Sequence, residues 1–327
     1  MADLSFLALL LLLLLPLALL FLILYVIVRP HPVNIPIKNR HVFITGGSSG
    51  IGLALAHQAA TEGARVSILA RSLDKLEEAK NYIQLSTGID VSLFAADVRD
   101  YDAVSKAVEE AGPIDLLIVN QGVFVAEELE KQGLDEVKFM VEVNLIGSFN
   151  MIKAAHPEMK KGEDRGPRSI ALMSSQAGRV GIYGYTAYSA SKVGLRGLGE
   201  ALQQEVISHD IHVSLVFPPD TDTPGLAEEN KRRPPLTGII AESSGAMKAE
   251  DVAKRALDGI KSASFIVRCN FEGLLLSIAT AGLSPRRSFV MAFFEVVAGG
   301  LFRLVALCFQ WSWYTSIQKW QAQNKRT

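Results

Sequence analysis

The sequence predicts an α/β fold, a doubly wound parallel sheet of the dinucleotide-binding (Rossmann) type, with an apolar segment at each end. Three observations support this. Short apolar runs alternate with helical stretches through the middle of the chain, as in parallel strands joined by helices. A glycine-rich turn follows the first of these runs. The mean hydropathy of +0.23 is high for a soluble enzyme, and the excess lies at the two ends.

Composition excludes several classes of function. The 327 residues carry 33 basic and 34 acidic side chains, a net charge of −1, so we expect no nucleic-acid partner, which would need a dense basic face. Cys269 and Cys308 lie far apart in the sequence and make neither a disulfide framework nor a metal-ligand cluster. We therefore predict no metal site.

The N-terminal segment is predicted to be a transmembrane anchor over residues 1–29. Leu4 to Val28 is almost unbroken apolar sequence, which as a helix would span roughly 37 Å and cross a hydrocarbon core. A cleaved signal peptide is the alternative, but the apolar region is long and Asp3 stands where basic residues would be expected. Arg29, Lys38 and Arg40 follow the segment, which predicts a body on the cytosolic side.

A proline-containing linker at residues 30–38 leads to the first predicted strand, His41–Ile44. A glycine-rich turn and an apparent helix follow. Glycines let the backbone approach a pyrophosphate, and a helix N-terminus favours its negative charge. Such a turn can also be only a turn, but the strand before it and the helix after it favour a dinucleotide site. The candidate cofactor residues are Gly46, Ser48, Ser49, Gly50, Ile51 and Gly52.

The second predicted strand, Arg65–Leu69, selects between the two nicotinamide cofactors. NAD-binding folds commonly place an acid after this strand to bind the ribose hydroxyls. This chain has Ala70 and Arg71 there, so a 2′-phosphate would meet a positive charge. The sequence therefore favours NADP(H), although Arg71 could also be a solvated residue at a helix start.

The alternation continues to the end of the predicted domain. Strands are expected at Val91–Ala95, Asp115–Val119, Ser169–Met173, Ile211–Phe217 and Ser264–Val267, with helices at Asp102–Ala111, Val137–Ile152 and Ala249–Ile260. Asp97 and Val98 follow the third strand, where they could touch an adenine, and Asn120 and Gly122 follow the fourth. Asn144 lies in the otherwise apolar helix, where a buried asparagine often only satisfies backbone groups.

A candidate proton-delivery unit lies in SSQAGRVGIYGYTAYSASK. On a helix, Tyr188 and Lys192 would project from one face. A nearby ammonium favours the phenolate, lowers the pKa of the tyrosine and makes it a better acid towards a carbonyl oxygen. The Ser175 hydroxyl could hold that same oxygen. A tyrosine and a lysine four positions apart are common on ordinary helices, so this motif depends on its context.

The segment from Pro218 to Gly238 is rich in proline, glycine and charge, which predicts a loop or lid over a site. Beyond it, residues 268–327 are strongly apolar. A spanning helix, a segment lying on the membrane and a subunit interface are all compatible with this tail. Glu295 and Arg303 make a clean span costly, while Trp311 and Trp313 suit an interfacial belt. We expect the tail to associate with a membrane, either spanning it or lying on it, with membrane lipid as a partner.

Together these motifs resemble the short-chain dehydrogenase/reductase family over residues 39–267. The resemblance implies a catalytic tetrad of Asn144, Ser175, Tyr188 and Lys192, with Tyr188 as the acid and Asn144 holding a relay water. Within this family, Arg71 favours NADPH as the cofactor. The cofactor contacts then include Gly46, Gly50, Gly52, Asp97, Tyr188, Lys192, Pro218 and Thr223. Two departures, Gln121 where alanine is usual and Pro219 where glycine is usual, make the neighbouring contacts less certain. Family relatives are often oligomers, so a homo-oligomer is an expectation by analogy.

Within the family, the Ser175–Lys192 stretch and PPDTDTPGLAEEN are similar to reductases of sphingolipid synthesis that act on a long-chain keto-base lipid. This resemblance implies that the protein lies in the endoplasmic reticulum membrane, with the catalytic domain (39–267) facing the cytosol.

Another family reductase, acting on a 3-ketoacyl-CoA or a ketosteroid, is the alternative. In the case of the CoA ester, Lys231, Arg232 and Arg233 could bind its phosphates. A catalytically silent scaffold that binds partners at the membrane is a third interpretation, and the intact Ser175, Tyr188 and Lys192 argue against it. For the amine substrate, one of Asp220, Asp222, Glu228 and Glu229 could pair with its ammonium, although these may equally be solvated charges.

Overall fold

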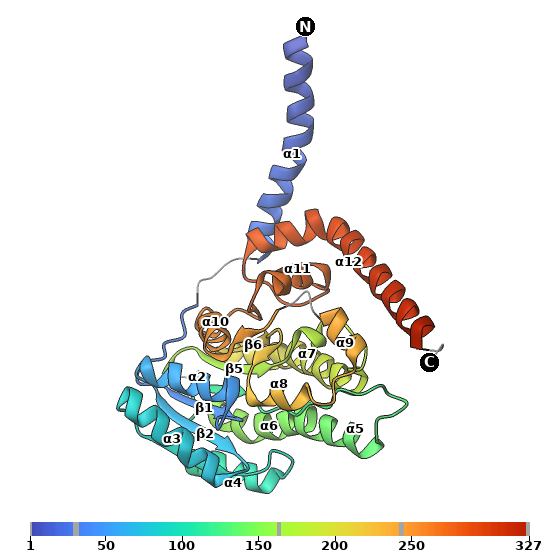
Figure 1. The fold of residues 1–327 in the computed structure, drawn as a ribbon. Helices are drawn as coiled ribbons and strands as arrows, with labels where there is room; N and C mark the ends of the chain where they lie inside the picture. Colours follow the sequence, from blue (N-terminus) through green and yellow to red (C-terminus); the bar gives the residue numbers. More distant parts are fainter. Residues whose placement is uncertain (1, 29–32, 162–164, 242–244, 325–327) are drawn as a thin grey trace.

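The computed structural model describes residues 2–28, 33–161, 165–241 and 245–324. Its main feature is a seven-stranded parallel sheet in the order β3-β2-β1-β4-β5-β6-β9 (Figure 1). The strands are β1 (His41–Thr45), β2 (Arg65–Ala70), β3 (Val91–Ala95), β4 (Leu116–Val119), β5 (Arg168–Met173), β6 (Ile211–Phe217) and β9 (Ile266–Arg268). Each predicted strand is present with small shifts at its ends, and the predicted doubly wound sheet is confirmed.

Helices cover both faces of this sheet, which is why its strands are apolar throughout rather than alternating. One core lies between the sheet and α2, α3 and α10, and the other between the sheet and α4, α6 and α7. The helices of the domain are α2 (Gly50–Thr61), α3 (Leu73–Thr87), α4 (Tyr101–Ala111), α5 (Leu134–Val141), α6 (Gly147–Lys160), α7 (Thr186–Val206), α8 (Pro224–Glu229), α9 (Pro235–Ala241) and α10 (Ala249–Lys261).

The strand order reverses between β1 and β4. The chain leaves β1 towards β2 and β3, then returns to β4 on the other side of β1 and continues outward to β9. In open parallel sheets, ligands bind at the carboxyl ends of the strands on either side of such a reversal. The topology therefore directs attention to the segments that follow β1 and β4.

The helix predicted at Val137–Ile152 is longer and is not uniform. It runs from Leu134 to Lys160 as α5, a π-helical turn at Glu142–Ile146, and α6. The π-turn contains Asn144, whose side chain is fully buried. Turns of this kind are frequent at functional sites.

The predicted lid contains regular structure. The short strand β7 (Thr221–Asp222) pairs with β8 (Met247–Lys248), and α8 and α9 lie between them. The pairing joins the two ends of the segment that carries α8 and α9.

Of the predicted linker, residues 30–32 lie outside the described residues, as does Arg29. From residue 33 onward the linker packs onto the domain: Ile35 and Ile37 are buried, and the Ile35 amide donates to the Lys261 carbonyl over 2.8 Å. This part of the segment is therefore a fixed connection rather than a free spacer.

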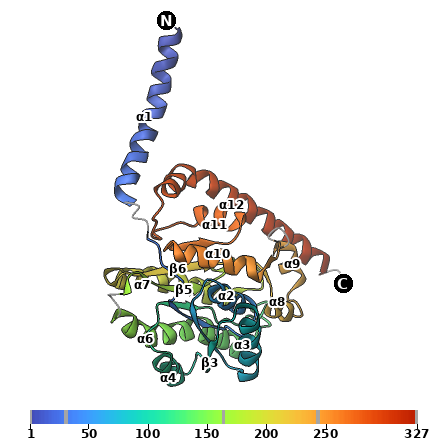
Figure 2. The same cartoon turned by 90° about the vertical axis from the view of Figure 1, so that its left-hand side faces the viewer.

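Two apolar helices lie at one end of the molecule, α1 (Ala2–Val28) and α12 (Phe289–Asn324), with α11 (Phe271–Ala279) between α12 and the domain (Figures 1 and 2). Both are long and apolar enough to cross a membrane, and both are almost wholly exposed over the segments concerned. They touch where Phe21 packs edge-on against Phe289 and Phe293, and then diverge. These two helices indicate association with a membrane.

Candidate active site

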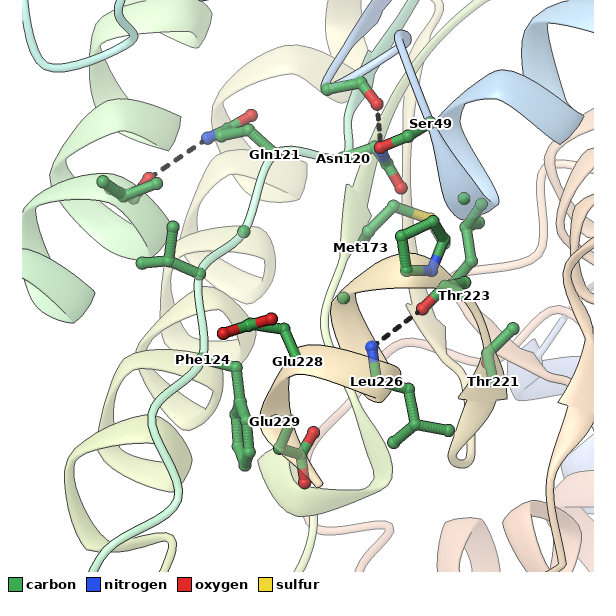
Figure 3. A pocket seen from close by; sticks show the side chains of 18 of the residues that line it. Ser49, Asn120, Gln121, Phe124, Met173, Thr221, Thr223, Leu226, Glu228 and Glu229 are labelled. Atoms are coloured by element: carbon green, nitrogen blue, oxygen red, sulfur yellow. Dashed lines mark hydrogen bonds between the residues drawn. The ribbon is translucent and has the colours of Figure 1, made fainter. Parts of the chain in front are cut away.

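A cavity of about 1110 Å³ lies at the carboxyl ends of the central strands. It extends from the turn after β1, past the ends of β2, β3 and β4, to Tyr188 and the lid helix α8 (Figure 3). All the predicted site residues line it except Gly52 and Asn144. The sequence motifs that pointed to a cofactor and those that pointed to catalysis therefore meet in one space.

The turn after β1 depends on its glycines. Gly46 and Gly50 have φ angles of +63° and +55°, a region that side chains rarely adopt. Gly52 does not face the cavity: a Cβ there would lie 2.1 Å from the Gly46 carbonyl oxygen and 2.5 Å from Asn120 Nδ2. Gly52 thus allows the first turn of α2 to press against the loop that it follows.

The N-terminus of α2 is suited to an anion. Ser49 is the residue that caps this helix, yet its side chain accepts no hydrogen bond from the helix, and Ser48, Ser49, Gly50 and Ile51 line the cavity. The first amides of a helix lack partners within it and carry partial positive charge. These residues fit the pyrophosphate of a dinucleotide.

At the end of β2, Arg71 is exposed and borders the cavity together with Ser72 and Lys75. The sequence analysis did not identify Lys75. Its position on α3, four residues after Arg71, could have indicated that it lies near the same site. After β3, Asp97 lies beside Val98 and pairs with Arg99 at 2.7 Å, which holds the pKa of the carboxyl below its usual value. This end of the cavity offers two cations and no unpaired acid to a ribose 2′-substituent.

Tyr188 and Lys192 lie on α7, one turn apart, as the sequence predicted. Lys192 is 4% exposed, and its Nζ donates to the Met173 carbonyl over 2.9 Å and lies 5.7 Å from the centre of the Tyr188 ring. Burial lowers the pKa of Lys192 to about 8. Both groups face the cavity from the same helix.

The pKa of Tyr188 differs from the sequence-based expectation. It is raised rather than lowered, because burial outweighs a hydrogen bond from Ser175 that acts in the opposite direction, and Glu229 and Asp220 raise it further. Lys192 has no lowering effect here, since its ammonium is directed to the Met173 carbonyl. A raised pKa keeps the phenol protonated at neutral pH, which a proton donor requires.

Ser175 is held against α7 by close packing. Its Oγ accepts a hydrogen bond from the Ala177 amide over 3.2 Å, and the neighbouring Ser174 Oγ donates to the Lys192 carbonyl. Gly178 makes this approach possible, because a Cβ there would lie 2.3 Å from Ser174 Oγ. The Ser175 hydroxyl is thereby placed beside Tyr188.

Asn144 lies behind the cavity and joins three elements. Its amide bonds both backbone groups of Val123, at 2.8 and 3.0 Å, and donates to Ser191 Oγ on α7 over 3.0 Å. Its side chain therefore satisfies backbone groups, as the simpler reading held. The relay role implied by family resemblance stays a prediction.

The segment after β4 shows what the unusual Gln121 does. Its side chain donates to Ser148 Oγ on α6 over 3.1 Å and accepts from Thr45 Oγ1. The Thr45 oxygen also accepts the Asn120 amide over 2.9 Å. Gly122 lies against both Lys192 and Asn144, since a Cβ there would be 3.4 Å from Lys192 Nζ. The amide group of Gln121 is therefore committed to Thr45 and Ser148.

Pro218 and Thr223 border the cavity at the end of β6, where the sequence placed them. Thr223 caps α8 by accepting the Leu226 amide over 3.2 Å, and its side chain lies over Gly50 (Figure 3). The lid and the glycine turn are thus in direct contact.

An aromatic cluster beside Tyr188 was not predicted. The Phe124 ring meets the Tyr188 and Tyr185 rings edge-on, with centroid distances of 4.1 and 4.7 Å. Tyr185 donates from its hydroxyl to Glu229 on α8 over 2.8 Å. Tyr185, one turn before Tyr188, was the available signal, but its partner on the lid could not be predicted from spacing.

Comparison with known proteins agrees with this geometry. Residues 40–234 match the family described as short chain dehydrogenase. A 3-dehydrosphinganine reductase of Arabidopsis thaliana is 68% identical over 320 residues, covering 98% of each chain. A second from the same plant is 66% identical over 300 residues, covering 92% of this chain and 91% of the relative. The 3-ketodihydrosphingosine reductase of Mus musculus is 36% identical over 308 residues, with the same coverage.

Solved structures support the fold. A short-chain dehydrogenase from Sphingobium yanoikuyae in complex with NADPH has a TM-score of 0.63 and 22% identity, covering 71% of this chain and 88% of its own. A short-chain dehydrogenase/reductase from Burkholderia phymatum in complex with NAD has a TM-score of 0.67 and 21% identity, covering 77% of this chain and 98% of its own. At these identities the likeness concerns the fold alone.

Proposed function

The chain belongs to the short-chain dehydrogenase family and is an oxidoreductase, and we propose that it reduces 3-ketodihydrosphingosine to dihydrosphingosine with NADPH. The observation that carries the chemistry is the meeting of Ser175, Tyr188 and Lys192 in the wall of one cavity whose other end is the glycine turn. The substrate follows from relatives that are 66–68% identical over nearly the whole chain and carry that activity.

In the proposed reaction, NADPH bound in the cavity would supply the hydride that reduces carbon 3 of the ketone. Tyr188 donates its phenolic proton to the carbonyl oxygen, so that the ketone becomes a secondary alcohol. The Ser175 hydroxyl holds that oxygen while negative charge develops on it. The buried Lys192, which lines the same wall and donates to the Met173 carbonyl, would hold the nicotinamide ribose, as the family resemblance implies.

We propose NADPH rather than NADH because of the end of the cavity beside β2. Arg71 and Lys75 both border it, and the nearest acid, Asp97, is paired with Arg99. A 2′-phosphate would therefore meet two cations and no uncompensated carboxylate. The residues that would hold the phosphates, Ser48 to Ile51, are those at the N-terminus of α2.

The apolar helices suggest where the enzyme works. A long-chain substrate stays in a bilayer, and a site held at the membrane surface shortens its transfer. We propose that α1 anchors the protein in the endoplasmic reticulum membrane with the domain facing the cytosol. Residues 1–29, 30–38, 39–267 and 268–327 then serve as anchor, connection, catalytic domain and membrane-associated tail.

The alternative substrate, a 3-ketoacyl-CoA, finds less support in the lid. Its phosphates would need free cations, yet Lys231 pairs with Glu228, and Arg232 pairs with Glu127 and Glu136 at 2.9 and 2.7 Å. Arg233 pairs with Asp220. The basic run is thus committed to neighbouring carboxylates.

Oxidation of NADPH by the detergent-purified full-length protein tests the proposal. 3-Ketodihydrosphingosine is compared with a 3-ketoacyl-CoA and a ketosteroid at equal concentration. We expect a rate with 3-ketodihydrosphingosine that far exceeds the other two and that Tyr188→Phe abolishes. A rate confined to another ketone would leave the chemistry standing and overturn the substrate.

A further inference from the structure

Four acidic side chains lie in the lid segment, and the structure separates them. Asp222 is exposed and does not border the cavity. Glu228 has a side chain that is 74% exposed and pairs with Lys231. Asp220 is neutralised by Arg233, with a distance of 2.8 Å between Oδ2 and Nη1. None of these three combines burial with a free negative charge.

Glu229 is largely buried, and it shares its cationic partner, Arg233, with Asp220. Its side chain is 10% exposed, it borders the cavity from α8, and it accepts a hydrogen bond from the Tyr185 hydroxyl over 2.8 Å. The nearest cation, Arg233, is 3.7 Å away through Nε and is already bonded to Asp220. Asp220, Glu229 and Arg233 together carry two negative charges and one positive charge, so this part of the wall has a net charge of −1.

The carboxylate lies close to the reacting group. Glu229 bonds Tyr185, whose ring centre is 6.0 Å from that of Tyr188, and both rings contact Phe124. Figure 3 shows Glu229 and Phe124 entering the same space from α8 and from the segment after β4. The negative charge of Glu229 also acts on the Tyr188 hydroxyl, whose pKa it helps to raise.

We propose that Glu229 binds the ammonium group of the substrate and so selects an amino ketone over a plain ketone. The inference rests on the proposed function. The amine of 3-ketodihydrosphingosine is on carbon 2, next to the carbonyl carbon, so a carbonyl oxygen held by Tyr188 and Ser175 fixes the ammonium nearby. A buried carboxylate that lacks a full counter-ion is stabilised by such a cation.

The test compares two substrates in two proteins. 1-Hydroxyoctadecan-3-one is 3-ketodihydrosphingosine without its amine. Glu229→Gln keeps the shape and the hydrogen bond with Tyr185 but removes the charge. We expect this variant to raise KM for the amino ketone roughly 10- to 100-fold, while KM for the deamino ketone and kcat for both change little. Asp222→Asn, an exposed acid on the same segment, serves as the matched control and should change neither constant.

A pH profile of the wild-type enzyme provides a second measurement. The pKa of Glu229 is raised to about 7, chiefly by burial, with Asp220 acting in the same direction and Tyr185 and Arg233 in the opposite one. The carboxyl gains its proton as the pH falls through 7. The kcat/KM for the amino ketone should therefore fall below pH 7 relative to the deamino ketone, and Glu229→Gln should remove this difference.

The outcomes separate the two claims. Equal losses for both ketones in Glu229→Gln, or a substrate ratio in the wild type that does not change between pH 6 and 7.5, would overturn the role of Glu229 and leave the reductase in place. A wild-type enzyme that does not reduce 3-ketodihydrosphingosine would overturn the proposed function itself. If Glu229→Gln does not fold, the wild-type pH comparison decides alone.

Discussion

The two ends of the cavity are built in different ways. At the nucleotide end, backbone shape makes the site: positive φ angles at Gly46 and Gly50, and close contact between Gly52 and the Gly46 carbonyl. At the lid end, side-chain partners make it: Tyr185 with Glu229, Arg233 with Asp220, and Arg232 with two glutamates. The nucleotide end therefore tolerates almost no substitution at a few glycine positions. At the lid end, the site depends on several pairs of side chains rather than on single positions.

This difference explains what can be learned from each end. A turn that binds any dinucleotide makes the same demands on the backbone, so it identifies the cofactor class and not the substrate. The lid pairs have no common backbone requirement, and we propose that their charges decide which substrate binds. Tyr188 lies between the two ends of the cavity, so a substitution at this position should affect the reaction itself rather than either end alone.

Tyr188→Phe should have the largest effect, because it removes the proposed proton donor, which lies between the two ends. We expect kcat to fall by about 10²- to 10⁴-fold. The phenyl ring keeps its contact with Phe124, so NADPH binding, followed by quenching of intrinsic fluorescence, should remain close to that of the wild type. Activity that survives in this variant would remove Tyr188 from the mechanism.

Gly52→Ala should damage the nucleotide end alone. The new methyl group would meet the Gly46 carbonyl oxygen at 2.1 Å, and the turn would have to shift. We expect weaker NADPH binding and a loss of about 1–3 kcal/mol in the free energy of unfolding, measured by titration and by denaturant. Gly197→Ala, in the interior of α7 with no atom within 4 Å of the new Cβ, is the control and should stabilise the protein slightly. Equal behaviour of the two variants would contradict the packing argument.

The sequence predicted most of the fold because the features concerned depend on residues that are close together in the chain. Strands buried on both faces are short and apolar, so β1 to β6 were placed with small errors at their ends. The glycine turn and the spacing of Tyr188 and Lys192 placed the site, because they depend on local geometry. The membrane helices followed from composition.

Contacts between distant segments could not be predicted in this way. The π-turn at Asn144 depends on hydrogen bonds with Val123 and Ser191, which are 21 and 47 residues away. The orientation of Gln121 depends on Thr45 and Ser148, and the pKa of Tyr188 depends on burial that no spacing reveals. The pairing of Glu229 with Tyr185 belongs to the same class, which is why four lid acids were equal candidates in the sequence.

Arg71→Ala should have an intermediate effect, confined to the choice of cofactor. Removing one charge-assisted contact to a 2′-phosphate should lower kcat/KM for NADPH roughly tenfold and leave that for NADH unchanged. Lys80→Ala is the control. Lys80 is a cation on the neighbouring helix α3 that pairs with Asp90 and does not border the cavity. Equal losses with NADPH and NADH would show that Arg71 does not read the phosphate.

Arg232→Ala should have the smallest effect, although Arg232 makes two ion pairs. Its side chain is 51% exposed, and ion pairs at such positions contribute less than about 1 kcal/mol because water and salt screen them. We expect unchanged kcat and KM for 3-ketodihydrosphingosine and a free energy of unfolding within 1 kcal/mol of the wild type. A large rise in KM would mean that the lid depends on this surface pair for its shape.

If instead a 3-ketoacyl-CoA were the substrate and Arg232 its phosphate contact, KM for the CoA ester would rise and its salt dependence would weaken. The variant therefore measures whether the exposed cations of the lid matter, as Glu229→Gln measures whether its buried carboxylate does.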